Sequence, residues 1–140
     1  MANEAVVRTS LQIKDGTLFY QSQPTAFVAD VSTGLGPTPG LVTVPVTGVS
    51  VSLAALTTPG FAFIQNLDAT NFIMVGVYDG TSFFPLLELL PGECYVVRLC
   101  RHLGDEFVGT GTPADANALR LMADPLGGAS CYARVEVFEK

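Results

Sequence analysis

The feature that most constrains the fold of this chain is an alternation of apolar and polar residues with a period of two, interrupted at short intervals by Gly, Pro, Asn or Asp. Successive side chains of a β-strand point to opposite faces, so these runs, rich in β-branched and aromatic residues, predict short strands. The fold class we expect is all-β: an antiparallel β-sandwich or jelly roll with about 8 to 10 short strands. The alternating runs lie at residues 5–13, 17–21, 25–31, 41–46, 48–54, 60–66, 71–78, 83–88, 93–100, 117–122 and 130–138.

The tripeptide Asp-Gly-Thr occurs twice and predicts a tight turn at each place. The turns lie at residues 14–17 and 78–81, where Gly supplies the positive φ of a hairpin turn and Asp tolerates it. Both are expected to be β-hairpins. The second leads into a strand that contains Pro85, which lacks an N–H and therefore belongs on a sheet edge or at a bulge.

Two segments predict long surface loops. Residues 32–40 hold three Gly and two Pro, and residues 101–116 end in a Gly- and Thr-rich run. Residues 113–123 could instead form a short helix with Pro113 in its first turn. We favour a strand from Ala118.

The composition predicts a protein whose surface is covered by neighbours. The 140 residues suit a single domain, 1–140, with residues 1–8 as a possible N-terminal arm. Hydrophobic residues make up 49% of the chain and charged residues only 14%, well below the roughly 25% of an ordinary soluble domain. Because solvated faces usually carry Lys and Glu, this composition favours an assembled protein over a free monomer.

Charge and hydropathy exclude several classes of partner. A net charge of −6 with seven basic residues cannot line a phosphate track, so no nucleic-acid partner is expected. No apolar run is long enough for a membrane span, and residues 1–14 have no apolar core of a secretion signal, so a cytosol-like compartment is expected. In that compartment three cysteines predict buried thiols rather than disulfides.

The residues that could carry chemistry do not form a motif, so we expect no enzyme, no metal and no cofactor. The lone histidine, His102, stands two residues from Cys100, too far along a strand for a direct hydrogen bond. Cys94, Cys100, His102 and Cys131 would make up a zinc ligand count, but not with the spacing of a zinc knuckle. Most Asp residues sit where turns need them.

The sequence gives weak support to three other kinds of site: a calcium loop, a phosphate loop and a sugar-binding platform. Asp105 and Glu106 alone are too few oxygens for a calcium loop, and residues 109–112 lack the Lys of a phosphate loop. The aromatic rings could form a sugar platform, although the chain has no Trp. Phe61 and Phe63 share one face of their strand, and we expect these rings to pack in the core.

The second half of the chain resembles small virion proteins of tailed bacteriophages. The resemblance is carried by a strand that ends in Asn66-Leu67-Asp68, a turn with Thr70-Asn71, a Pro-Gly-Glu turn at 91–93 and a closing strand at 133–139. It covers roughly residues 59 to 139 and implies a β-sandwich or jelly roll of the capsid decoration (cement) or fibre type, located in the virion and assembled in the host cytoplasm.

Under this resemblance the partners are copies of the chain itself, with a trimer favoured, and the major capsid protein or another virion protein. Residues 2–7 could add a strand to the sheet edge of a neighbour, or could simply be the first strand of their own fold. The interaction residues we expect, in this segment and in the loop after it, are Ala2, Asn3, Glu4, Ala5, Val6, Val7, Leu35, Pro37 and Pro39.

Two other classes compete with this hypothesis. A carbohydrate- or peptide-binding module would present a concave face with exposed Tyr20, Tyr78 or Tyr132. An enzyme on a β-barrel would need several converging His or carboxylate residues, for which this chain has one histidine and few clustered acids.

Overall fold

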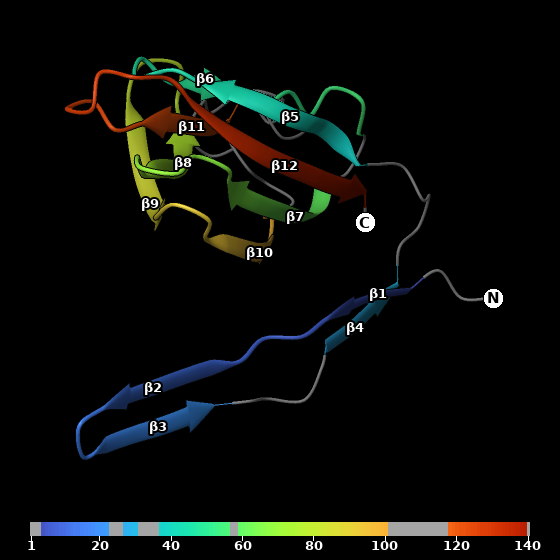
Figure 1. The fold of residues 1–140 in the computed structure, drawn as a ribbon. Helices are drawn as coiled ribbons and strands as arrows, with labels where there is room; N and C mark the ends of the chain where they lie inside the picture. Colours follow the sequence, from blue (N-terminus) through green and yellow to red (C-terminus); the bar gives the residue numbers. More distant parts are fainter. Residues whose placement is uncertain (1–3, 23–26, 31–36, 57–58, 101–117, 140) are drawn as a thin grey trace. The chain divides into compact units, whose positions relative to one another are not determined.

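The computed structural model is all-β and divides into two compact units, residues 1–34 and 35–140, each described here by itself (Figure 1). The description covers residues 4–22, 27–30, 37–56, 59–100 and 118–139. Within these residues no helix is long and apolar enough to cross a membrane. The first unit contains β1 (Glu4–Val7), β2 (Leu11–Asp15), β3 (Leu18–Ser22) and β4 (Phe27–Asp30). The second contains β5 (Thr38–Val44), β6 (Val49–Ser50), β7 (Pro59–Asn66), β8 (Ile73–Tyr78), β9 (Phe83–Leu89), β10 (Cys94–Arg98), β11 (Leu119–Ala123) and β12 (Cys131–Glu139).

The second unit is an antiparallel β-sandwich. One four-stranded sheet has the order β10-β7-β12-β5 and the other the order β6-β11-β8-β9. Apolar side chains of both sheets meet in one buried cluster, to which residues 51–56 after β6 also contribute. The sandwich expected from the period-two pattern is therefore confirmed.

The core of the sandwich is aliphatic. Alternate residues of each central strand point inward, as in β12, where Cys131, Ala133, Val135 and Val137 are all 0% exposed. Ile64 of β7, Ile73 of β8 and Leu121 of β11 fill the space between them. Small and branched side chains at these positions let the two sheets approach closely.

The aromatic rings do not form this core, and the expectation that they would was wrong. No Phe or Tyr of the described residues is among its buried members. Phe84, Tyr95 and Tyr132 are more than 40% exposed, and Phe61 and Phe63 are only partly buried. The period-two pattern has an apolar set on each face of these strands, and the aliphatic set is the one that the sandwich buries.

The hairpin of β8 and β9 forms as expected and explains Pro85. The carboxylate of Asp79 accepts hydrogen bonds from the backbone N–H groups of Thr81 and Ser82, at 2.8 and 2.6 Å. Strand β9 is the edge of its sheet, and its register shifts where Gly76 pairs with Pro85. Pro85 thus has both properties that its missing N–H requires: an edge strand and a bulge.

The first unit is a two-stranded β-ribbon. Strand β2 pairs with β3 around a turn at Gly16, whose φ is +53°, and β1 pairs with β4. The first expected hairpin is therefore confirmed. The predicted strand 5–13 is interrupted, since residues 8–10 separate β1 from β2.

Three expectations about the chain's organisation need adjustment. The sandwich occupies residues 35–140 rather than the single domain 1–140, and residues 4–7 are one strand of a longer ribbon. Thr38–Gly40 belong to β5, so the loop expected at 32–40 does not extend over these three residues. Strand β5 lies at the edge of its sheet, where a proline such as Pro39 is tolerated. Of the strand expected at 48–54 only Val49–Ser50 is extended, and the strand from Ala118 is confirmed as β11.

Substituting Gly76 with Ala is expected to destabilise the sandwich by about 2 kcal/mol or more, because the new Cβ would lie inside contact distance of backbone atoms that cannot move away. It would lie 2.0 Å from the carbonyl oxygen of Phe84. Urea denaturation measures the change. Gly92→Asn is the control: Gly92 has a φ of +80° and open space around it, and Asn tolerates this turn position. Equal stability of Gly76→Ala and wild type would contradict the bulge geometry.

Candidate functional site

The cysteines do not converge on a chemical site. Cys131 is buried in the core, whereas Cys94 and Cys100 are exposed, so the expectation of buried thiols is right only for Cys131. His102 lies outside the described residues, as do Asp105, Glu106 and the glycine-rich run 109–112. Within the described part of the chain, no three His, Cys, Asp or Glu residues are grouped as metal ligands would be.

The expected interaction residues fall into both units. Ala2, Asn3 and Leu35 lie outside the described residues. Glu4, Ala5, Val6 and Val7 form β1 and pair with Asp30, Ala29, Val28 and Phe27 of β4. Pro37 is exposed just before β5, and Pro39 is an exposed residue of that strand opposite Glu136. The edge of β1 that faces β4 is therefore occupied within the chain.

A buried carboxamide ties the two sheets together at the end of β7. Asn66 is 0% exposed. Its Nδ2 donates to the carbonyl oxygens of Asn71 at 2.8 Å and of Leu89, the last residue of β9, at 3.0 Å. Its Oδ1 accepts from the N–H of Asp68 at 2.9 Å. Because every polar atom of this side chain is paired, its burial stabilises one arrangement of the sheets.

The loop that follows Asn66 is held by a carboxylate. Oδ1 of Asp68 accepts from the N–H groups of Asn71, at 2.7 Å, and Thr70, at 2.8 Å. These hydrogen bonds, the one from Asn71 first, lower the pKa of Asp68 below its ordinary 3.8. Nearby, burial and then the charge of Asp68 raise the pKa of the Cys131 thiol. The Asn-Leu-Asp and Thr-Asn pairs of the sequence thus form a structural loop.

The outer face of the β10-β7-β12-β5 sheet carries several exposed apolar side chains. Register places its residues on one side, because directly opposite residues of antiparallel strands share a face. Tyr132 is 53% exposed, Phe138 37%, Val96 43% and Leu41 69%. We call this surface the aromatic face, defined by Leu41, Phe61, Phe63, Val96, Tyr132 and Phe138. Figure 1 shows β12 crossing the sheet between β5 and β7.

Charged side chains lie among these rings. The guanidinium of Arg134 lies 5.5 Å from the ring centre of Phe63, and that of Arg98 lies 5.4 Å from Phe61. Arg134 also forms an ion pair with Glu136, its neighbour on the same side of β12, at 2.6 Å. Guanidinium groups over rings add cation–π attraction, and the arginine stems cover part of the apolar surface.

On the opposite sheet, a cation–π contact and hydrogen bonds hold Tyr78 in place. Arg120 of β11 lies over the ring of Tyr78 at 4.1 Å and donates to the carbonyl oxygen of Thr47 at 2.8 Å. Tyr78 in turn donates to the carbonyl oxygen of Gly80 at 2.9 Å. These contacts fix Tyr78 within the chain, so of the two tyrosines of the sandwich singled out above, Tyr132 is the exposed one.

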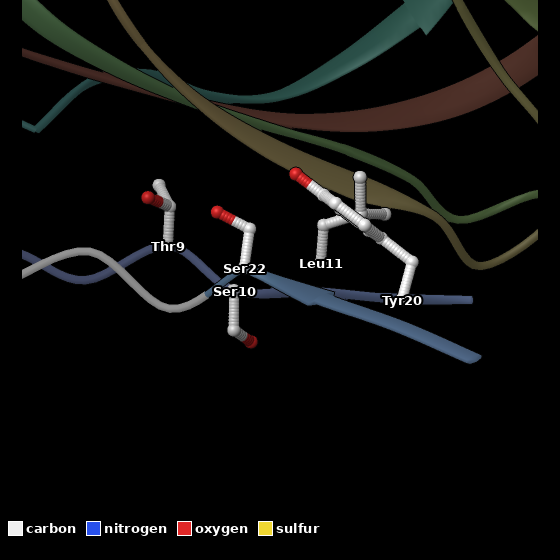
Figure 2. A pocket seen from close by; sticks show the side chains of 5 residues that line it. All are labelled: Thr9, Ser10, Leu11, Tyr20 and Ser22. Atoms are coloured by element: carbon white, nitrogen blue, oxygen red, sulfur yellow. The ribbon is translucent and has the colours of Figure 1, made fainter. Parts of the chain in front are cut away.

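The β-ribbon also has one apolar side. Leu11 and Tyr20 project from the same side, 53% and 50% exposed, together with Thr9 and Ser22, while Ser10 points the other way (Figure 2). They line a shallow hollow of about 230 Å³. Ile13 lies opposite Tyr20 in the ribbon. A two-stranded ribbon has no core of its own, so these side chains stay accessible.

The aromatic face is the surface feature that sequence reasoning missed. The signal was present in the closing strand, where Tyr132, Arg134, Glu136 and Phe138 alternate with Cys131, Ala133, Val135 and Val137. We expected aromatic rings to be buried before aliphatic side chains, and this assumption placed the aromatic set in the core.

Comparisons with protein-family models, with curated proteins and with solved structures found no match for this chain.

Replacing Asn66 with Ala should lower the free energy of unfolding by about 3 kcal/mol, because it leaves buried partners of the carboxamide without hydrogen bonds. Chemical denaturation at neutral pH measures the loss. Gln65→Ala, at a half-buried position on the outer side of the same strand, is the matched control and should cost less than half as much. A loss confined to Gln65→Ala would contradict the assigned role of Asn66.

The stability of the sandwich should fall as the pH drops below about 4, where Asp68 and Asp79 begin to bind protons more readily in the unfolded chain. Both carboxylates accept backbone hydrogen bonds that lower their pKa in the folded state, chiefly from Asn71 and Ser82 respectively. Their contribution is therefore present above the unfolded pKa and disappears as the pH falls through the folded one. Asp68→Asn and Asp79→Asn should each flatten the dependence of the melting temperature on pH between 5 and about 2. An unchanged slope in both variants would refute this origin.

Proposed function

We propose that this chain is a non-catalytic structural protein of a larger particle, of the phage virion decoration or cement type. In this role it binds copies of itself and a shell protein. The observation that carries the proposal is the aromatic face, where apolar side chains including Leu41 and Tyr132 are exposed over a regular sheet. Exposed apolar side chains gathered on one face are typical of a protein–protein contact.

The composition and the resemblance support the same proposal. With charged residues at 14% of the chain, the protein has few of the solvated side chains that keep a free monomer dispersed. Part of the sequence that carries the resemblance to small virion proteins, Asn66 to Asn71, forms a hydrogen-bonded loop between the two sheets. A loop of this kind helps to hold the two sheets in one arrangement, as a protein that binds through the outer face of a sheet requires. The proposal requires self-binding; the number of copies, for which the sequence favoured three, is left to measurement.

A second candidate is a carbohydrate- or peptide-binding module, favoured by the exposed Tyr20 and the hollow beside it. The hollow offers the hydroxyl groups of Thr9, Ser22 and Tyr20 next to the apolar side chain of Leu11. Aromatic rings with neighbouring hydroxyls can stack on and hydrogen-bond to a sugar. Fewer exposed apolar side chains gather at this hollow than on the aromatic face, and we place this candidate second.

Light scattering of the purified full chain over a dilution series tests the proposal. The expected result is an oligomer that forms as the concentration rises from the micromolar range, with a mass that is a multiple of 14.7 kDa. A monomer at every concentration would contradict self-binding. If soluble oligosaccharides or peptides then bound to the monomer, and Tyr20→Ala abolished that binding, the binding module would replace the present proposal.

A further inference from the structure

We propose that the aromatic face binds the same face of a second copy about a two-fold axis that lies in the interface, perpendicular to β12 and centred on Val135. This inference rests on the proposed self-binding and names the surface and symmetry of the contact. A two-fold contact requires a surface that is complementary to itself. The outward residues of β12 have that property.

On either side of Val135, the outward side chains of β12 are a charged residue followed by an aromatic residue. Arg134 and Glu136 are the nearest on either side, and Tyr132 and Phe138 are the next. Rotation about an axis across the strand exchanges the two directions. Arg134 of each copy then faces Glu136 of the other, and Tyr132 faces Phe138. Opposite charges and aromatic pairs meet at every outward position of the strand.

On β5, one of the two neighbours of β12, the same rotation also brings compatible residues together. Leu41 of β5 lies opposite Arg134, and Pro39 lies opposite Glu136. The rotation brings Leu41 of one copy against Pro39 of the other, so two apolar groups meet. Pro39, one of the residues expected from the sequence to make contacts, is thereby assigned a partner.

The alternative two-fold arrangement is disfavoured. An axis along β12 would place Arg134 against Arg134 and Glu136 against Glu136. Like charges brought together in a desolvated contact are strongly unfavourable, so the charge pattern selects the axis across the strand. The existing ion pair between Arg134 and Glu136, 51% and 21% exposed, would then become part of a four-charge network.

The size of the face sets the strength of the contact. Four strands about 4.8 Å apart and about 25 Å long present a face of roughly 450 Å², or about 900 Å² for both copies. Specific interfaces usually exceed about 1,000 Å² in total. The contact is therefore at the small end, and the pair should dissociate on dilution in the micromolar range.

The test is charge complementation in the full chain, followed by sedimentation equilibrium. Arg134→Glu and Glu136→Arg should each weaken self-association about tenfold or more, because each variant presents two like charges to itself. An equimolar mixture should restore a complex of twice the 14.7 kDa chain mass. Glu88→Arg, at an exposed position of β9 in the other sheet, is the matched control and should associate as the wild type does.

Circular dichroism establishes that each variant is folded, and Tyr132→Ser is a second, uncharged variant that should also weaken association. Oligomers that are insensitive to these changes, including a trimer, would overturn the two-fold contact but leave the proposed self-binding standing. Loss of association in Leu11→Ser and Ile13→Ser alone would place the ribbon in the interface and also overturn it. A wild-type monomer at all concentrations would contradict both proposals.

Discussion

The hydrogen bonds of the Asn66 side chain join parts of the sandwich that no continuous strand connects. A carboxamide that is fully buried must pair both its donors and its acceptor, and here the partners are Asn71, Leu89 and Asp68. Those partners belong to the loop between the sheets and to the end of an edge strand of the opposite sheet. The backbone of Asn66 adds bonds with Glu93 and Gly92, at 2.9 and 3.2 Å. Asn66 thus joins the loop after β7, the turn between β9 and β10, and both sheets.

The core of the sandwich is aliphatic. The central strands bury Ala62, Ala133 and Val135 rather than rings, and the aromatic residues are left at least partly exposed. Burying those rings between copies would recover the hydrophobic free energy that the monomer leaves unused, at about 25 cal/mol per Å². The proposal of a protein-binding role rests on this distribution, because the exposed rings lie on the outer face of a sheet.

Local patterns allowed most strands to be predicted, because alternation and turn chemistry act within a few residues. The Asp79-Gly80 turn and the edge position of Pro85 followed from single residues whose backbone requirements are narrow. The buried face of each strand was harder, because β7 carries apolar residues on both sides and alternation alone does not rank an aliphatic set against an aromatic one. The role of Asn66 could not be predicted from local sequence either, since its partner Leu89 lies 23 residues away. The separation of the ribbon from the sandwich depends on contacts that no local pattern encodes.

The most direct test of the account is a comparison of amide and aromatic NMR spectra of the full chain at low and high concentration. If copies associate through the aromatic face, the resonances that move will be those of Tyr132, Arg134, Glu136 and Phe138, with their neighbours on β5 and β7. The buried core and the outer face around Tyr78 and Arg120 will stay unchanged. Concentration-dependent shifts confined to the ribbon around Leu11 and Tyr20, or spectra that do not change with concentration, would contradict the assignment of this face as the site of self-binding.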